Sequence, residues 1–372
     1  MSLPNHKKND SGILRCAGAD PGCPCIPRRQ FLTQAAALAG SAVFPWSALA
    51  PQERLTSPPT KGWIDVHHHF APTAYMQVLK EHRNFPAALV GWSAQKTIED
   101  MDQGGVTTSM NSIVTPGVSF GDEDQARHLA RDSNECAAKL ASDYPGRFGS
   151  FATLTLPDID SSLKEIEFAL DVLKMEGVQM FSSYGNKWLG DSFFAPIFEE
   201  LNRRKAVVFV HPTFNDCCKN LLSGVAAAAI EYGTDTTRAI VNMVFSGASK
   251  KYPDVRMIFS HAGGTMPFLI GRFADRDPPK GVRPGAWSHD FQAEVQRFYY
   301  DTAQAFHPVP MTALRQVVGI SQIVFGTDYP YRSSLENTNG LIQSGIFSAQ
   351  ELQAIRSENA LELLPQLRKA GQ

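Results

Sequence analysis

The sequence has no excess of charge of either sign and no long apolar run. Lys and Arg number 35 and Asp and Glu number 37, which gives a formal net charge of −2 over 372 residues. Without a basic bias, nucleic acid is not an expected partner. No apolar run reaches the roughly 18 residues that a membrane span needs. Hydrophobic residues nevertheless make up 43% of the chain, which is ample for a core.

Cysteine is scarce as well. Of the six cysteines, three lie in the first 50 residues, and Cys136, Cys217 and Cys218 remain. Three cysteines, two of them adjacent, do not make a disulfide framework, and their spacing is not that of a zinc ribbon. We therefore expect ordinary reduced thiols, as in a protein that folds in the cytoplasm before any export.

The first 50 residues have the order of an export signal. The pair Arg28 and Arg29 is followed by a moderately apolar stretch, and small residues stand at Ala48 and Ala50. This order is typical of a twin-arginine signal peptide, after whose cleavage a periplasmic or otherwise exported protein has no membrane contact. A cytoplasmic protein with a disordered tail is the alternative. The expected organisation is a signal over residues 1–50, a linker over 51–61 and one domain over 62–372.

Short β-rich runs alternate with helix-like segments along that domain. Several of these runs are almost continuously apolar, as buried parallel strands are. The predicted strands span residues 63–70, 107–114, 148–155, 177–183, 206–212, 256–263, 298–303 and 322–330. Eight strands alternating with helices predict an α/β fold, the closed (β/α)8 or TIM barrel. The long segment 71–100 is expected to line the mouth of the site, and residues 331–372 to form closing helices.

Histidine is rare, yet three of the 10 histidines are adjacent in IDVHHHF, Ile64–Phe70. Strand side chains alternate between two faces, so His67 and His69 point one way and His68 points the other. We expect the pair to project into the barrel and His68 to face the helices or pack beside the site. Asp65 shares the inward face one layer lower and is a candidate for orienting a ligand.

Three other predicted strands end in groups that bind metals, namely His211, His261 and Asp328. In a barrel of this type the carboxyl ends of the strands meet at the functional face, so these groups should converge with His67 and His69. Three imidazoles and one carboxylate suit zinc, or a similar divalent ion such as manganese, and leave a position for water or substrate. The expected ligands are His67, His69, His211 and Asp328. His261 remains available for catalytic proton transfer, and Asp328 is expected to be catalytic as well as a ligand.

Four further residues bear on this site. Met180 stands in the fourth predicted strand, where barrels with two metals often carry a bridging carboxylated lysine, so we predict one ion. Asp301 ends the seventh strand and can bond either to a ligand or to His261. His307 and Trp188 are weaker candidates for the site, with surface or packing roles as the alternatives.

Five motifs resemble the amidohydrolase superfamily, in particular the branch of aminocarboxymuconate-semialdehyde decarboxylase and related non-oxidative decarboxylases. The motifs are IDVHHHF, VVFVHP, IFSHAGGTMPFLIGR, FYYDTA and FGTDYPY, within residues 62–366. The last two look closest to 6-methylsalicylate decarboxylase-like members. The resemblance implies a barrel of the metal-dependent hydrolase type, with the four ligands named above and His261 as the histidine that activates a metal-bound water.

The resemblance also bears on the substrate. Arg272, eleven residues after His261, matches an arginine that binds substrate carboxylate from a neighbouring subunit, which implies a homodimer. The family's other substrate-binding arginine has no clear counterpart, since Arg83 is the only arginine in the loop after the first strand and cannot be aligned. We expect a decarboxylase of an aromatic or conjugated carboxylic acid. A lactone or amide hydrolase that uses the same metal-bound water is the alternative, and a binding protein with a decayed site is a third.

Overall fold

The computed structural model describes residues 62–82, 86–213, 215–218, 221–274 and 291–370. The expected signal peptide, the linker and Arg83 lie outside these residues. Within the described chain, eight strands form one parallel sheet whose order follows the sequence. The strands are β1 (Trp63–His69), β2 (Val106–Ser112), β3 (Phe148–Ala152), β4 (Gly177–Phe181), β7 (Val207–His211), β8 (Arg256–Phe259), β9 (Tyr299–Asp301) and β10 (Ile323–Val324). A small antiparallel hairpin, β5 (Ser183–Tyr184) and β6 (Lys187–Trp188), follows β4.

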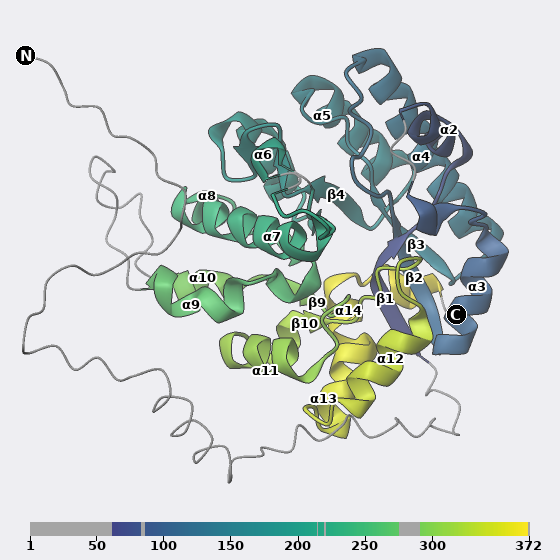
Figure 1. Cartoon of the computed structure of the whole chain (residues 1–372). Coiled ribbons are helices and arrows are strands. Elements are labelled where there is room, and N and C mark those ends of the chain that lie inside the picture. Colours follow the sequence, from purple (N-terminus) through teal and green to yellow (C-terminus); the bar gives the residue numbers. More distant parts are fainter. Residues whose placement is uncertain (1–61, 83–85, 214, 219–220, 275–290, 371–372) are drawn as a thin grey trace, which may run out of the picture. The chain divides into compact units, whose positions relative to one another are not determined.

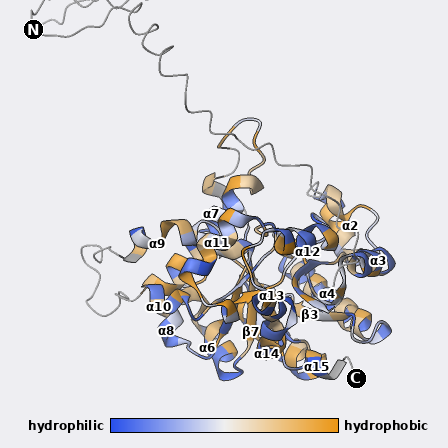
Figure 2. Cartoon of the chain, turned by 90° about the horizontal axis from the view of Figure 1, so that it is seen from below, coloured by the Kyte–Doolittle hydropathy of each residue, from blue (hydrophilic) through white to orange (hydrophobic). Residues whose placement is uncertain are grey.

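Helices connect the strands and surround the sheet (Figure 1). They are α2 (Thr73–Glu81), α3 (Ala94–Gly104), α4 (Glu123–Asp143), α5 (Ile159–Glu167), α6 (Ala195–Arg203), α7 (Ala228–Phe245), α8 (Ala248–Lys251), α9 (Met266–Ala274), α10 (Phe291–Val295), α11 (Pro308–Val317), α12 (Ser334–Gln343), α13 (Ala349–Gln353), α14 (Asn359–Leu363) and α15 (Leu367–Ala370). Figure 2 shows hydrophobic strands inside a ring of helices whose outer faces are largely hydrophilic. Among the described residues, no helix has the length and apolar character needed to span a membrane.

Several helices begin where the sequence supplies a capping side chain. Ser93 accepts a hydrogen bond from the backbone N–H of Lys96 at the start of α3, and Asp122 accepts one from Gln125 at the start of α4. Such side chains satisfy the backbone donors that the first turn of a helix leaves unpaired. Helix α3 ends at Gly105, which adopts the left-handed conformation favoured by glycine at this position.

The barrel is closed between β1 and the segment that follows β10. The backbone N–H of Val66 donates to the carbonyl of Phe325 at 2.9 Å, and that of His69 donates to the carbonyl of Tyr329 at 2.8 Å. These bonds complete the ring of eight strands and confirm the predicted (β/α)8 barrel. The last strand, Ile323–Val324, is much shorter than the predicted 322–330. Asp328 has a φ of +63°, so extended backbone does not continue through this residue.

The sixth predicted strand is shorter than expected for a similar reason. Regular pairing in β8 ends at Phe259, and His261 and Ala262 have φ values of +55° and +57° in a short 3-10 turn. His261 and Asp328 therefore lie in the turns that follow their strands and not at the strand ends. In contrast, His69, His211 and Asp301 are the last residues of β1, β7 and β9, as expected.

One end of the barrel is filled by an apolar cluster. Ile64, Val66 and Phe209 pack there with side chains from other strands, and Leu363 and Leu364 of the C-terminal region cover them. Helices were expected over residues 331–372, and within the described part, up to residue 370, the chain does form them. With the amino ends of the strands packed in this way, the site is expected at their carboxyl ends, as in other barrels of this type.

Candidate metal centre and active site

Four of the predicted site residues meet at the carboxyl end of the barrel. One ligand atom from each of them lies within 4.8 Å of the others, and all four side chains are buried. His67 and His69 come from β1, a third from the end of β7 and the fourth from the turn after β10. The cluster consists of His67, His69, His211 and Asp328. The structure therefore brings together the full ligand set that the sequence predicted.

The geometry of this cluster fits a divalent cation. The Oδ1 atom of Asp328 lies 3.3 Å from Nε2 of His67 and 3.0 Å from Nε2 of His69. All three atoms are buried and lack a hydrogen-bond partner, which is costly unless something else pairs with them. Three imidazoles and one carboxylate are donors that zinc or manganese accepts. A single ion at this position would satisfy the unpaired atoms.

Hydrogen bonds on the far side of each imidazole fix the direction of its ring. Nδ1 of His67 is 2.8 Å from Oδ2 of Asp301, and Nδ1 of His211 is 2.7 Å from the carbonyl of Pro212. Nδ1 of His69 is 3.3 Å from the carbonyl of Ser112. With Nδ1 engaged in each ring, Nε2 is left to face the centre of the cluster.

The electrostatics of the cluster favour a proton on one of its three imidazoles, because burial lowers the pKa of His69 as well as that of His211. Burial lowers the pKa of His67, but the carboxylates of Asp301 and Asp328 outweigh it and raise that pKa to about 10. Burial raises the pKa of Asp328, yet the neighbouring His67 and His261 hold it well below its usual range. The pKa of His211 is lowered by burial and by the other histidines. The carboxylates that hold a proton on His67 would equally attract a metal cation.

His68 lies on the opposite face of β1, as the alternation of side chains predicted. Its Nδ1 atom is 2.9 Å from Oδ2 of Asp65, and its ring stacks on Tyr329 with centroids 4.7 Å apart. Asp65 was expected to orient a ligand, and it does contact one of the four, because it accepts a hydrogen bond from the backbone N–H of His67. It bonds to no ring of the cluster. Its other partners are the ring of His68 and both the N–H and the hydroxyl of Thr327. The register of β1 against β2 shifts between Asp65 and His68. The alternation of side chains between the two faces, which holds from His67 to His69, therefore does not extend to Asp65.

Asp301 takes the supporting position that was expected of Asp65. It bonds to the ring of His67 through Oδ2, and its Oδ1 atom accepts from the backbone N–H of His261 at 2.8 Å. The prediction that Asp301 bonds to a ligand or to His261 is confirmed on both counts. The ring of His261 lies beside the cluster, with Nε2 3.4 Å from Oδ2 of Asp328. This places His261 next to the ligands but outside the set of four.

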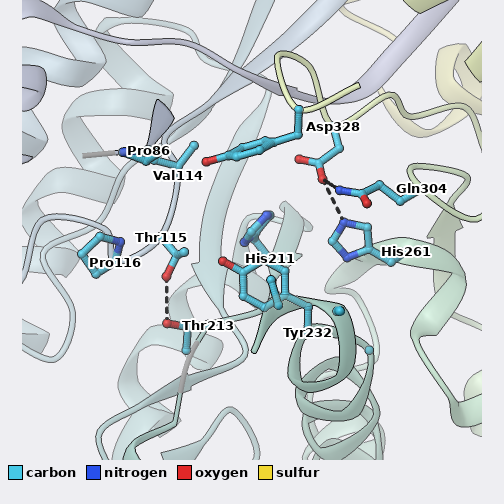
Figure 3. Close-up of a pocket in the computed structure, with 14 residues that line it drawn as sticks. Pro86, Val114, Thr115, Pro116, His211, Thr213, Tyr232, His261, Gln304 and Asp328 are labelled. Atoms are coloured by element: carbon cyan, nitrogen blue, oxygen red, sulfur yellow. Dashed lines mark hydrogen bonds and ion pairs between the residues drawn. The ribbon is translucent and has the colours of Figure 1, made fainter. Parts of the chain in front are cut away.

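A cavity of about 860 Å³ opens over this cluster (Figure 3). Figure 3 shows Gln304 and His261 both directed at the carboxylate of Asp328, and Nε2 of Gln304 donates to its Oδ2 atom. On the opposite wall, the hydroxyls of Thr115 and Thr213 are 3.0 Å apart. The described lining residues include no Lys or Arg; they are Pro86, Val114, Thr115, Pro116, His211, Thr213, Ala228, Ala229, Tyr232, Gly233, His261, Gln304, Asp328 and Tyr331.

The other sequence candidates lie outside this cavity. Arg272 is exposed on α9, and His307 is exposed at the start of α11. Trp188 is a packed aromatic whose Nε1 is 3.4 Å from Asp235. The segment 71–100 contains α2 and part of α3 and reaches the cavity wall through Pro86. Gln304 was missed because a single glutamine in a loop carries no recognisable signal, although it lies three residues after Asp301.

The expectation of reduced thiols is wrong for one pair of cysteines. Cys217 and Cys218 are joined by a disulfide in the connection between β7 and α7. The spacing of the cysteines did not predict this bond, because a disulfide between adjacent cysteines closes no chain loop. The turn nevertheless brings the two sulfur atoms together. Cys136 is a free thiol on α4.

Comparison with known proteins identifies the family of this chain. The sequence pattern of the amidohydrolase family matches residues 64–366. The chain belongs to the amidohydrolase family. Relatives within this amidohydrolase group include 6-methylsalicylic acid decarboxylase of Penicillium expansum, 34% identical over 317 residues that cover 82% of this chain and 97% of that protein. Another is 2-amino-3-carboxymuconate-6-semialdehyde decarboxylase of Dictyostelium discoideum, 27% identical with 82% and 85% covered.

A solved structure of similar fold is also known. The dihydroxybenzoic acid decarboxylase of Polaromonas sp. JS666, with bound manganese and the inhibitor 2-nitroresorcinol, has a TM-score of 0.72. It is 20% identical, and the match covers 82% of this amidohydrolase and 97% of that chain. The resemblance found in the sequence, to the decarboxylase branch of the amidohydrolases, is thus confirmed.

Proposed function

We propose that this amidohydrolase is a metal-dependent, non-oxidative decarboxylase that releases CO2 from an aromatic carboxylic acid. The observation that carries the proposal is the cluster of three imidazoles and one carboxylate at the floor of a large cavity, with a fourth imidazole, that of His261, beside it. The relatives support this reading over a hydrolase, because the named activities of both curated relatives described above are decarboxylations.

We propose that one divalent ion is held by His67, His69, His211 and Asp328. The ligand set is that expected for zinc, and manganese, which the Polaromonas enzyme binds, is the alternative. A bound ion would supply a positive charge that holds the carboxylate and an adjacent oxygen of the substrate. Metal analysis of the purified protein tests both the stoichiometry and the identity of the ion.

The proton for the reaction is assigned to His261. In the proposed step the bond between the ring carbon and the carboxyl carbon breaks, and its electron pair remains on the ring carbon. A proton from the His261 imidazolium forms the new C–H bond, and the products are the arene and CO2. Asp328, whose Oδ2 is 3.4 Å from Nε2 of His261, stabilises the protonated imidazole. The imidazole borders the cavity and recovers its proton from solvent once product has left.

The walls of the cavity suit a flat, largely apolar substrate. Val114, Pro116 and Ala228 supply apolar surface, and Tyr232 and Tyr331 are among the residues that add polar groups to the lining. Burial raises the pKa of both tyrosines, so each hydroxyl is neutral at ordinary pH. A neutral hydroxyl can hydrogen-bond to a phenolic oxygen of the substrate without repelling it.

Arg272 has a place in this proposal only in a homodimer. Its side chain is exposed on α9 and does not line the cavity of its own chain. We propose that it reaches the substrate carboxylate in a second copy of the chain, where a guanidinium pairs well with a carboxylate. Light scattering measures the oligomeric state, and Arg272→Ala should raise KM more than it lowers kcat.

The export signal proposed for residues 1–50 has an independent test. Amino-terminal sequencing of protein recovered from the periplasm should begin after Ala50. Recovery of the uncut chain from the cytoplasm would contradict the proposal.

A substrate panel decides between the two catalytic proposals. Salicylate-type acids and simple aryl lactones are offered to the metal-loaded protein, with CO2 release and ring opening measured separately. Release of CO2 from a hydroxybenzoic acid supports the decarboxylase. Opening of lactones without any release of CO2 would overturn it in favour of the hydrolase.

A further inference from the structure

We propose that Asp301 is a positioning residue that sets the place of the proton-donating His261 relative to the metal ligand His67. The bridge itself is a structural feature, whereas its effect on turnover rests on the function proposed above. Asp301 ends β9 and is completely buried. Because the side chain is buried, bulk water does not compete for its hydrogen bonds.

The two carboxylate oxygens of Asp301 have different partners. Oδ2 lies 2.8 Å from Nδ1 of His67, a residue 234 positions away in the sequence. Oδ1 accepts from the backbone N–H groups of His261 at 2.8 Å and of Ala303 at 3.0 Å. A single rigid group therefore joins β1, the turn after β8 and the turn after β9. Hydrogen bonds to an ionised carboxylate are the stronger kind.

The backbone of His261 needs such an anchor. His261 and Ala262 have φ values of +55° and +57°, a region that residues with a Cβ atom rarely adopt. Strained backbone of this kind persists where surrounding contacts hold it, and it clusters at functional sites. The bond from the His261 N–H to Asp301 lies at the start of the strained pair and fixes where the His261 ring projects.

Close packing leaves little freedom for the bridge to shift. A Cβ atom added to Gly326 would lie 2.9 Å from Cβ of His67 and 3.0 Å from Cβ of Asp301. The backbone after β10, which also carries Asp328, is therefore in direct contact with both residues. On the other side, a Cβ on Gly263 would lie 2.8 Å from the ring of Tyr300, so the turn after His261 is held against β9.

An asparagine at position 301 tests whether the hydrogen bonds of Asp301 matter or only the space that its side chain fills. It has nearly the same shape, but only one of its two terminal atoms accepts hydrogen bonds. If its oxygen faces Nδ1 of His67, its NH2 group opposes the N–H of His261. If it flips, the NH2 group faces His67 and favours the proton on Nε2, the atom that should face the ion. In either orientation one half of the bridge is lost.

The experiment compares Asp301→Asn with the wild type and with Asp65→Asn, which removes a second buried carboxylate. The ring partner of Asp65 is His68, and Asp65 meets His67 only through the backbone N–H. Three quantities are measured on each protein: the affinity for Zn²⁺ by competition with a chelator, hydrogen exchange of the backbone over residues 259–264, and kcat and KM at saturating Zn²⁺. Thermal unfolding shows which variants are folded.

For Asp301→Asn we expect faster exchange at the His261 amide, a 10- to 100-fold loss of Zn²⁺ affinity and a kcat at least about 10-fold below wild type even at saturating Zn²⁺. The KM should change less than threefold. Asp65→Asn should be destabilised without faster exchange at the His261 amide. If Asp301→Asn does not fold, Asp301→Ser, whose hydroxyl can serve only one side of the bridge at a time, provides the same comparison.

Two results would contradict the proposed positioning role of Asp301. One is wild-type exchange at the His261 amide in the folded Asp301 variant. The other is full recovery of kcat at saturating Zn²⁺, which would limit Asp301 to supporting the metal ligand. If the wild-type enzyme releases CO2 from no aromatic acid, the proposed function fails, but the exchange and Zn²⁺ affinity measurements still decide whether the bridge exists.

Discussion

Strand β1 carries two histidine–carboxylate pairs that are alike in distance and burial but lie on opposite faces. Nδ1 of His67 is 2.8 Å from Asp301, and Nδ1 of His68 is 2.9 Å from Asp65. All four side chains are completely buried. By local criteria the two pairs are equivalent, and neither could be selected as functional from its own geometry.

The surroundings of the two imidazole rings separate the two pairs. Nε2 of His67 faces Asp328 at 3.3 Å, beside two further imidazoles and the cavity. The ring of His68 stacks on Tyr329, and its partner Asp65 holds Thr327 in the segment that closes the barrel. The inner pair thus belongs to the candidate metal centre, whereas the outer pair fastens the seam between β1 and the chain after β10. A buried histidine–carboxylate pair acquires its role from the groups that surround it.

The largest effect should come from removing an inner-face ligand. In His69→Ala the cluster loses one of its four donors, so Zn²⁺ affinity should fall by more than about 100-fold, beyond the 10- to 100-fold typical of losing a supporting contact. Metal analysis after dialysis and chelator competition measure this. A variant that retains one ion per chain at wild-type affinity would contradict the ligand assignment.

His261→Asn should be the next most damaging change, and it should act on chemistry alone. We expect turnover to fall by roughly 10²- to 10⁴-fold, the usual contribution of general acid catalysis, while the metal content stays near wild type. Steady-state CO2 release and metal analysis on the same preparation test the two halves of this expectation. Normal turnover would show that His261 is not the proton donor.

Removing the histidine of the outer pair should lower the stability of the protein and leave its metal content unchanged. In His68→Leu the carboxylate of Asp65 loses its ring partner in the interior, which should lower the free energy of unfolding by about 3–5 kcal/mol. The Zn²⁺ stoichiometry should remain close to that of the wild type, because His68 does not face the cluster. Urea unfolding and metal analysis measure the two quantities. Loss of the ion from a folded His68 variant would mean that the two faces are not independent.

The smallest effect is expected at Thr327, a second partner of Asp65. Thr327→Val keeps the shape of the side chain but removes the hydroxyl that donates to Asp65 at 2.6 Å. One buried hydrogen bond to a charged group contributes roughly 1.5–3 kcal/mol. Urea unfolding should show a loss in this range, smaller than that of His68→Leu. An equal or greater loss would place the main support of the seam at Thr327.

The barrel and the four candidate ligands were predictable because both follow from local patterns. Apolar runs alternating with helical segments indicate the fold, and the two-residue period of a strand separates His67 and His69 from His68. The ends of the strands were not predictable with the same accuracy. His261 and Asp328, which follow their strands, have positive φ values that nothing in the local sequence pattern predicts.

The supporting residues escaped prediction for another reason. Gln304, Tyr331 and Thr213 are ordinary loop residues that meet at one cavity only because the loops converge there. The contact between Asp65 and the ring of His68 depended on a shift in strand register that alternation cannot reveal. The disulfide between Cys217 and Cys218 depended on the path of a turn.

The sequence by itself thus determined the fold class and the kinds of donor atoms offered at the carboxyl ends of the strands, since periodicity and residue type act over a few positions. Only the tertiary structure decided which carboxylate supports which histidine. The contact between His67 and Asp301 joins residues 234 positions apart. Its existence depends on how eight strands close into a ring, and no local pattern contains that information.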